Sequence, residues 1–250
     1  MQRIIVFCGL LLCSGGAAAQ DRPPQAPARS PDFFLAPPRG WIGVGGGLVV
    51  PRAGGELFHF VSDQLTVDRS DLRTPVFDLE AGIAVAPNFA VVTGFETGRQ
   101  QVPSEYRHFV SSIAQPIEQT TKLEQLNVTV GLRYAPLGMG RRISRYAFIP
   151  RRIVPSIAAG LNLSHYQLTQ YGEFVDYVDL SIFTDSFQSN GWATGPYVRG
   201  GADVQVWRHV FLAVSGKYSW GHAGLDSDFV GFKGIDLAGF TGHTGFSVVF

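Results

Sequence analysis

The chain has 250 residues, and its 20 lysines and arginines balance its 20 aspartates and glutamates, so the formal net charge is zero. This balance excludes a basic nucleic-acid-binding domain, whose pI lies above about 9, and we expect no nucleic-acid partner. Only 16% of the residues are charged, below the ~25% of soluble globular proteins. Beyond the start of the chain no apolar run approaches the ~18 residues of a transmembrane helix, so any membrane crossing must be made without helices.

The N-terminus has the pattern of a cleaved signal peptide. Arg3 gives a positive start, residues 4–12 form a short apolar stretch, and three alanines at 17–19 supply the small residues that a signal peptidase requires. A lipoprotein signal is the alternative, because Cys13 follows three leucines. However, Leu12 stands where such signals have a small residue.

Both cysteines of the chain, Cys8 and Cys13, lie within the predicted signal peptide, residues 1–19. The mature protein therefore has no disulfide, thiol catalysis or cysteine-ligated metal, and we expect neither a metal nor a cofactor. Residues 20–39 follow as a linker, because their many prolines favour extended chain without a packed core. The folded body is expected over residues 40–250.

In this body, apolar side chains alternate with small or polar ones. Val128 and Val130, for example, alternate with Asn127 and Thr129, and in a strand the two sets point to opposite faces. The last segment sustains the pattern for about 12 residues, whereas strands of globular proteins run about 5–6 and membrane-spanning strands about 9–11. Eight segments show the alternation: residues 41–50, 76–86, 89–98, 125–134, 156–164, 198–206, 210–220 and 239–250.

The connections between these segments differ systematically in length. Residues 87–88 and 207–209 are short turns, and 136–152 is a longer connection on the same side. The other four are long and polar, near 51–75, 99–121, 167–191 and 221–234. This arrangement predicts an all-β protein, an eight-stranded antiparallel up-and-down transmembrane β-barrel with both termini and the linker in the periplasm. A soluble lipocalin-like barrel is disfavoured, because it would point its apolar face inward, whereas here the charged residues share a face with glycine.

The C-terminal strand carries a further signal, since it ends in the aromatic Phe250. In this strand and the preceding hairpin segment, residues 210–220, the chain resembles the eight-stranded outer-membrane β-barrel family, the OmpA/OmpX-like proteins. The resemblance implies a place in the outer membrane and a C-terminal strand that the barrel assembly machinery recognises. Phe246, Val248 and Phe250 would form this assembly signal.

The strand face opposite the apolar one carries eight titratable side chains: Asp78, Glu80, Glu96, Arg133, Arg199, Asp203, Lys217 and His243. Eight strands leave an interior only wide enough for side chains to fill. Charges confined there must pair, because an unpaired charge costs several kcal/mol in desolvation. We interpret this set as a plug of salt bridges in the lumen. A gated pathway for ions or small solutes and a catalytic carboxylate pair are the alternatives.

Two charged segments lie outside the predicted strands. The connection 136–152 contains five arginines, Arg141, Arg142, Arg145, Arg151 and Arg152. They form either a solvated turn or a contact with inner-leaflet phosphates, which attract cations. The loop 167–191 has four acids and no lysine or arginine, with Glu173, Asp176, Asp179 and Asp185. We interpret it as a solvated loop, with a divalent-ion or partner site as the alternative.

These patterns predict a non-enzymatic protein of the outer membrane with a structural role or a surface-interaction role through its loops. A narrow porin for small solutes is one alternative, and a lipid-modifying enzyme is another. The His-x-Ser-Asn motif of lipid-A deacylases is absent, because neither His108 nor His222 is followed by Ser and Asn at that spacing. We expect a monomer whose partners are outer-membrane lipids and the barrel assembly machinery.

Overall fold

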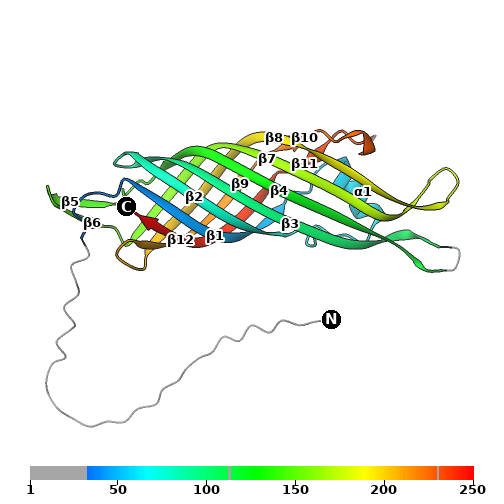
Figure 1. Ribbon diagram of the computed structural model, residues 1–250, viewed down its shortest axis with the longest axis horizontal. Coiled ribbons are helices and arrows are strands. Elements are labelled where there is room, and N and C mark those ends of the chain that lie inside the picture. Colours follow the sequence, from blue (N-terminus) through cyan, green and yellow to red (C-terminus); the bar gives the residue numbers. More distant parts are fainter. Residues whose placement is uncertain (1–32, 112–113, 230) are drawn as a thin grey trace, which may run out of the picture. The chain divides into compact units, whose positions relative to one another are not determined.

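The computed structural model describes residues 33–111, 114–229 and 231–250, so the predicted signal peptide and most of the linker lie outside the described residues. Eight antiparallel strands close into a barrel in the order β1-β12-β9-β8-β7-β4-β3-β2 (Figure 1). Their bounds are β1 Gly40–Pro51, β2 Thr74–Ala86, β3 Phe89–Val110, β4 Pro116–Tyr134, β7 Ile153–Val175, β8 Ile182–Gln205, β9 Val210–Ser219 and β12 Gly239–Val249. Strands that follow each other along the chain are neighbours, and β1 pairs with β12 to close the ring. The predicted fold class is confirmed.

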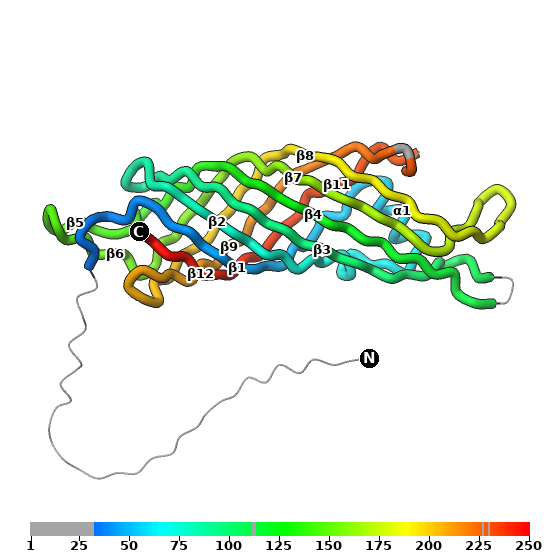
Figure 2. Tube along the Cα trace, viewed as in Figure 1, coloured from blue at the N-terminus to red at the C-terminus, as the bar shows by residue number. Residues whose placement is uncertain are grey.

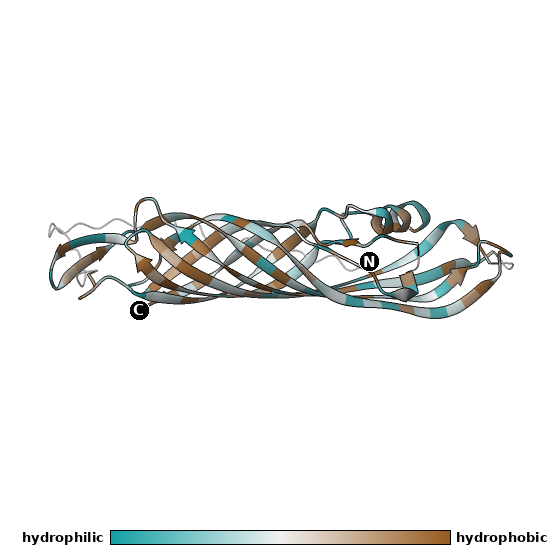
Figure 3. Ribbon diagram, turned by 90° about the horizontal axis from the view of Figure 1, so that it is seen from above, coloured by the Kyte–Doolittle hydropathy of each residue, from teal (hydrophilic) through white to brown (hydrophobic). Residues whose placement is uncertain are grey.

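The strands divide side chains between inside and outside as the alternation predicted. On β4, Val130 is 55% exposed on the outer face, whereas Asn127 and Arg133 are buried in the interior. Apolar residues alternate with polar or small ones along the strands (Figure 3). An exposed apolar belt therefore surrounds the barrel, and the polar residues are turned inward.

Four strands run much further than the sequence pattern predicted. β3 has 22 residues, β4 has 19, β7 has 23 and β8 has 24. The hairpins β3–β4 and β7–β8 extend beyond the other strands at one end of the barrel, here called the hairpin end (Figure 2). The prediction that residues 99–121 and 167–191 form long loops was therefore wrong.

The polarity of the two strand faces reverses within these long strands, which explains the error. On β3 the outward side chains are mainly polar from Arg99 onward, and the inward ones are mainly apolar from Val102, with Ser104 as the buried exception. The change occurs at one height on neighbouring strands, since Arg99 lies opposite Glu124 while Thr97 lies opposite Leu126. The sequence of a strand with a polar outer face lacks the outward apolar residues by which the membrane strands were predicted. Such a segment is therefore predicted as a polar loop.

The interior of the hairpin end is an apolar core. The helix α1 (Glu56–Gln64), in the connection from β1 to β2, contributes Leu57, Phe58 and Val61. These residues join Val102, Tyr106, Ile117 and Leu168 of the long strands in one buried cluster. No helix within the described residues is long and apolar enough to span a membrane.

The connection from β9 to β12 also folds onto the hairpin end. It contains the short elements β10 (His222–Ala223), η1 (Ser227–Phe229) and β11 (Ile235–Asp236). Asp226 and Asp228 accept hydrogen bonds from the backbone N–H groups of Asn190 and Gln188, at 2.9 and 3.0 Å. They do so where β8 has passed the end of its neighbour β9. The segment after α1 bonds to β3 in a similar position.

The opposite end, here called the short-turn end, comprises residues 33–39, 86–89, 135–152 and 206–209. The 136–152 connection forms a small hairpin of β5 (Gly140–Ser144) and β6 (Ala147–Pro150). β1 starts at Gly40, as predicted, but the last residues of the linker also pack. Phe34 exchanges two backbone hydrogen bonds with Phe148, at 2.7 and 2.8 Å, and its ring stacks on His209 at 4.6 Å. Both phenylalanines are buried.

Candidate functional site

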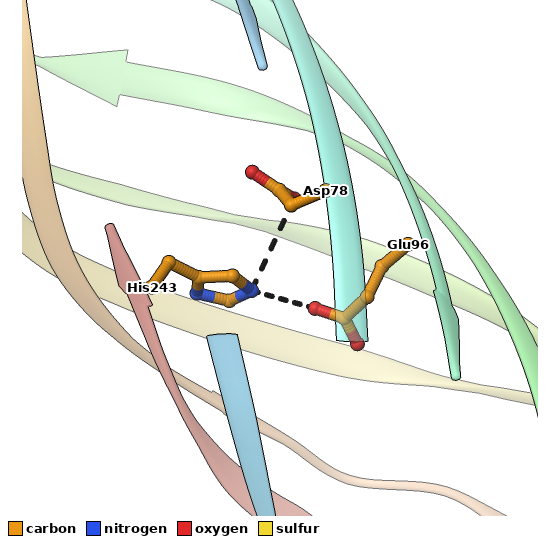
Figure 4. Close-up of side chains that lie close together, drawn as sticks. All are labelled: Asp78, Glu96 and His243. Atoms are coloured by element: carbon orange, nitrogen blue, oxygen red, sulfur yellow. Dashed lines mark hydrogen bonds and ion pairs between the residues drawn. The ribbon is translucent and has the colours of Figure 1, made fainter. Parts of the chain in front are cut away.

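The eight titratable side chains that the alternation predicts for the interior all lie inside the barrel, joined by ion pairs. One half of the network is centred on Glu96 of β3. Lys217 Nζ of β9 lies 2.9 Å from Glu96 Oε2, and His243 Nε2 of β12 lies 2.6 Å from the same oxygen. Asp78 of β2 approaches His243 Nε2 at 3.9 Å, so the imidazole lies between two carboxylates (Figure 4).

The other half of the network is built on two arginines. Arg199 of β8 pairs with Glu80 of β2 and lies 3.9 Å from Asp78, which connects the two halves. Arg133 of β4 pairs with Asp203 of β8 and reaches Glu80 at 4.0 Å. The eight residues thus form one continuous network across the lumen.

The barrel order explains which residues meet. β9 and β3 are four places apart in the eight-membered ring, as are β8 and β2, so each pair lies on opposite walls. The lysine and arginine side chains are long enough to cross an interior of this width. Glu96 and Lys217 are only 2% and 4% exposed, so their charges have little access to solvent and depend on each other.

The charges of the network balance when His243 is protonated. Four carboxylates face three permanent cations, and the imidazolium form of His243 supplies the fourth positive charge. A proton on Nε2 also lets the ring donate a hydrogen bond to Glu96.

Asp78, Glu96 and His243 also bring ligand atoms within 4.8 Å of one another, the spacing of a metal site. However, Lys217 already pairs with Glu96, and Arg199 lies beside Asp78. A divalent ion would have to compete with these two permanent cations for the carboxylates. The donor set therefore favours ion pairing over metal binding.

Trp41 belongs to the network, although the sequence analysis did not single it out. Its indole N–H donates a hydrogen bond to Glu80 Oε1 at 3.1 Å, and the Arg133 guanidinium lies 4.8 Å from its ring centroid. Gly82 is its register partner on β2, and a Cβ atom there would collide with the indole ring. The alternation along β1 did contain this signal, because it places Trp41 on the inward face opposite to Ile42.

Neutral polar side chains complete the hydrogen bonding of the charged groups. Asn127 Nδ2 donates to Glu96 Oε1 at 3.0 Å, and Arg199 Nε donates to Ser215 Oγ at 2.8 Å. Glu96 therefore accepts from Lys217, His243 and Asn127, which is the bonding that a buried carboxylate requires.

Little space remains around the network. The cavity beside it, lined by Arg133, Arg199 and Lys217 among others, has a volume of about 40 Å³. A buried water needs roughly 10–15 Å³ by this measure, so the cavity has room for a few waters and for no larger solute.

The other predicted residues lie away from the network. Phe246, Val248 and Phe250 are exposed on the outer face at the end of the chain. The five arginines of the 136–152 connection are all exposed, in or beside the β5–β6 hairpin.

The four acids of the predicted third loop are distributed over the β7–β8 hairpin. Glu173 lies in β7 and Asp185 in β8, while Asp176 and Asp179 lie in the turn between them. Asp179 Oδ1 accepts a hydrogen bond from the Ser181 N–H at 2.9 Å, and the bonds from Ser181 lower the pKa of Asp179. Among the described residues these acids form no three-ligand group suited to a metal ion. Two of them, Asp176 and Asp179, accept backbone hydrogen bonds within the turn.

The closed ring of eight strands, the exposed apolar belt and the charged interior define the fold of an eight-stranded outer-membrane β-barrel. No family model matches the sequence, and no curated protein matches it. Among solved structures, the chain is similar to the outer membrane protein OprG from Pseudomonas aeruginosa, with a TM-score of 0.54 and 14% identity over 88% of this chain and 98% of that one. Neisserial surface protein A matches with a TM-score of 0.45 and 11% identity over 88% and 97% of the two chains. The likeness to OprG confirms the fold, and at this identity it carries no function.

Proposed function

We propose that the protein is an integral, non-enzymatic protein of the outer membrane of a didermic bacterium, whose closed barrel anchors a surface extension. The exposed apolar belt supports the membrane placement, because such a belt is unfavourable in water and suited to lipid. Aromatic side chains flank the belt, as in membrane barrels. Trp192, Tyr218 and Trp220 lie toward the hairpin end, and Phe89, Tyr134, Trp207 and Phe250 lie toward the short-turn end.

The lengths of the connections support an orientation. Outer-membrane barrels have short turns on the periplasmic side and long segments outside. The short-turn end, with the start of β1 and the end of β12, would therefore face the periplasm. The long hairpins would project from the cell. The reversal of polarity at Arg99 and Glu124 marks the height at which β3 and β4 would leave the outer leaflet.

The observation that carries the proposal of a closed barrel is that its interior is filled at three levels. The hairpin end holds the apolar core around α1, and the middle holds the charge network with its cavity of about 40 Å³. At the short-turn end, Phe34, Phe148 and Phe211 pack in a second buried cluster with Trp41. A continuous water path would have to pass all three levels.

The extension supports a role in surface interaction. At the tip of the β7–β8 hairpin Val178 is 95% exposed, with Tyr177 and Leu180 exposed beside it. Leu180 has a φ of 60°, a left-handed conformation that is rare for a leucine. The Asp176 carboxylate accepts a hydrogen bond from the Val178 N–H at 2.7 Å and so helps to fix this turn. An ordered turn that presents apolar side chains is suited to contact with another macromolecule.

Single-channel recording in planar bilayers tests the closed barrel directly. The purified full-length protein, shown to be folded by its heat-modifiable migration, should insert without steady conductance. Steady conductance of the wild type would instead support the narrow porin. A change in lipid-A mass on expression would support the lipid-modifying enzyme and contradict the non-enzymatic role.

A further inference from the structure

A groove of about 610 Å³ lies at the short-turn end, outside the closed interior. Its walls come from three segments: the end of the linker with Arg39, the end of β2 with Val85, and the segment from Leu137 into β5 with Arg142. Phe148, fixed by its backbone bonds to Phe34, closes one side. Its volume lies in the range of small-molecule sites, roughly 300–1,000 Å³.

The surroundings of this groove are strongly positive. The short-turn end contains no aspartate or glutamate, and its basic side chains are Arg39, Arg141, Arg142, Arg145, Arg151, Arg152 and Arg208. Among the described residues neither Arg39 nor Arg142 has a carboxylate partner within 4.0 Å. Their guanidinium groups are exposed and remain available to an anion, and arginine binds phosphate oxygens in a bidentate fashion.

One wall of the groove continues the apolar belt. Val85 is 60% exposed and lies on the outward face of β2 in line with Ile83, and Leu137 is also exposed. The groove therefore has a basic side and an apolar side, and the apolar side faces the region that lipid would occupy. A free anion in solution would use only the basic side.

We propose that this groove binds a phospholipid of the periplasmic leaflet, with a preference for an anionic head group. Arg39 and Arg142 would bind the phosphate, and Val85, Leu137 and Phe148 would contact the glycerol backbone and the first methylenes of the acyl chains. The excess of arginine around the groove favours phosphatidylglycerol over a zwitterionic lipid. This inference rests on the proposed membrane placement.

Native mass spectrometry of the full-length protein, released from mixed micelles of phosphatidylglycerol and phosphatidylcholine, tests the proposal. The wild type should retain one phosphatidylglycerol in preference to phosphatidylcholine. The double variant Arg39→Gln/Arg142→Gln should lose this retention by at least about tenfold, since hydrogen bonds to charged groups contribute strongly to binding. Leu137→Ser should also weaken retention, because it removes part of the apolar wall.

Arg141→Gln/Arg145→Gln is the matched control, because it removes the same charge from the same end of the barrel at two arginines that do not line the groove, and it should retain the lipid. Equal loss in both double variants would overturn the site, as it would show only general attraction by the arginines. Competition by glycerol phosphate as strong as that by the lipid would also overturn it, in favour of a free-anion site. Failure of the wild type to insert into bilayers would reject the membrane placement itself, whereas normal insertion without lipid preference would reject only the groove.

Discussion

At the scale of single residues, Glu96 is the buried carboxylate of the barrel that depends on three hydrogen-bond donors. Its carboxylate is nearly inaccessible to solvent and accepts from Lys217, His243 and Asn127. These bonds link β3 to three other strands, β9, β12 and β4. A buried ion pair of this kind contributes little over an apolar pair of the same shape, but losing one partner is costly.

We therefore expect Lys217→Met to lower the free energy of unfolding by ~3–5 kcal/mol, because it leaves the Glu96 charge undercompensated. The double variant Lys217→Met/Glu96→Gln should recover a large part of this loss. Urea unfolding in detergent or bilayers, followed by the heat-modifiable shift, measures both. If the double variant is less stable than Lys217→Met alone, the two residues are not coupled as the structure indicates.

The inward position of each network residue could be predicted from the sequence, because alternation along a strand fixes its face. Lys217 and Glu96 were placed inside by this argument. The partner of each charge could not be predicted, since it depends on the stagger between strands and on the reach of each side chain. Trp41 shows the remaining gap: its face followed from the alternation, but its bond to Glu80 depends on the glycine at position 82, opposite it.

At the scale of one strand, β4 carries two environments on its outer face. Residues from Leu126 to Tyr134 are apolar at every outward position, and those from Glu118 to Glu124 are polar. The first part was predicted from the sequence and the second was not, because an apolar outer face was expected along the whole strand. Face polarity is set by the surrounding solvent, so in the proposed membrane placement it changes where the strand would leave the lipid.

Arginine substitutions along β4 should report this change. Val130→Arg, in the middle of the apolar belt, should cost ~2–4 kcal/mol, the cost of an arginine at the bilayer midplane. Thr120→Arg, on the same face beyond the reversal, should cost less than about 0.5 kcal/mol, as for an ordinary surface site. Unfolding in lipid vesicles gives both values, and equal costs would argue that β4 crosses no membrane.

The last strand, β12, allows a separate test of assembly. Phe246, Val248 and Phe250 share its outer face, in the arrangement that the family resemblance assigns to recognition by the assembly machinery. Deletion of Phe250 should reduce the folded protein in the outer-membrane fraction and leave unassembled protein to periplasmic proteases. Replacement of Thr244, on the same face, by Val serves as the control. An unchanged yield after the deletion would show that Phe250 is not part of the signal.

At the scale of the whole molecule, the three filled levels act in series. The charge network lies between the apolar core of the hairpin end and the phenylalanine cluster of the short-turn end. Breaking one ion pair of the network therefore leaves the two apolar clusters in place, although Trp41 belongs both to the network and to the phenylalanine cluster. Loss of an ion pair in the network should therefore lower the stability of the barrel without making it permeable.

We accordingly expect Arg199→Ala to destabilise the barrel without creating steady conductance. Arg199 contacts Glu80, Asp78 and Ser215, so its loss exposes unpaired charge but no path. Planar-bilayer recording of the variant beside the wild type checks this expectation, and Arg145→Ala controls for the loss of one arginine elsewhere. Large steady currents from Arg199→Ala alone would show that the network is the only barrier.

The hydrogen bonds that Asp226 and Asp228 accept from β8 have a consequence for association between copies of the chain. Where β8 continues past β9, its backbone N–H groups form a free sheet edge, which is a template for adding a strand from another chain. The two carboxylates occupy two of these groups, and they surround them with negative charge. By occupying part of this edge, the two carboxylates disfavour edge-to-edge pairing of β8 with another copy of the chain.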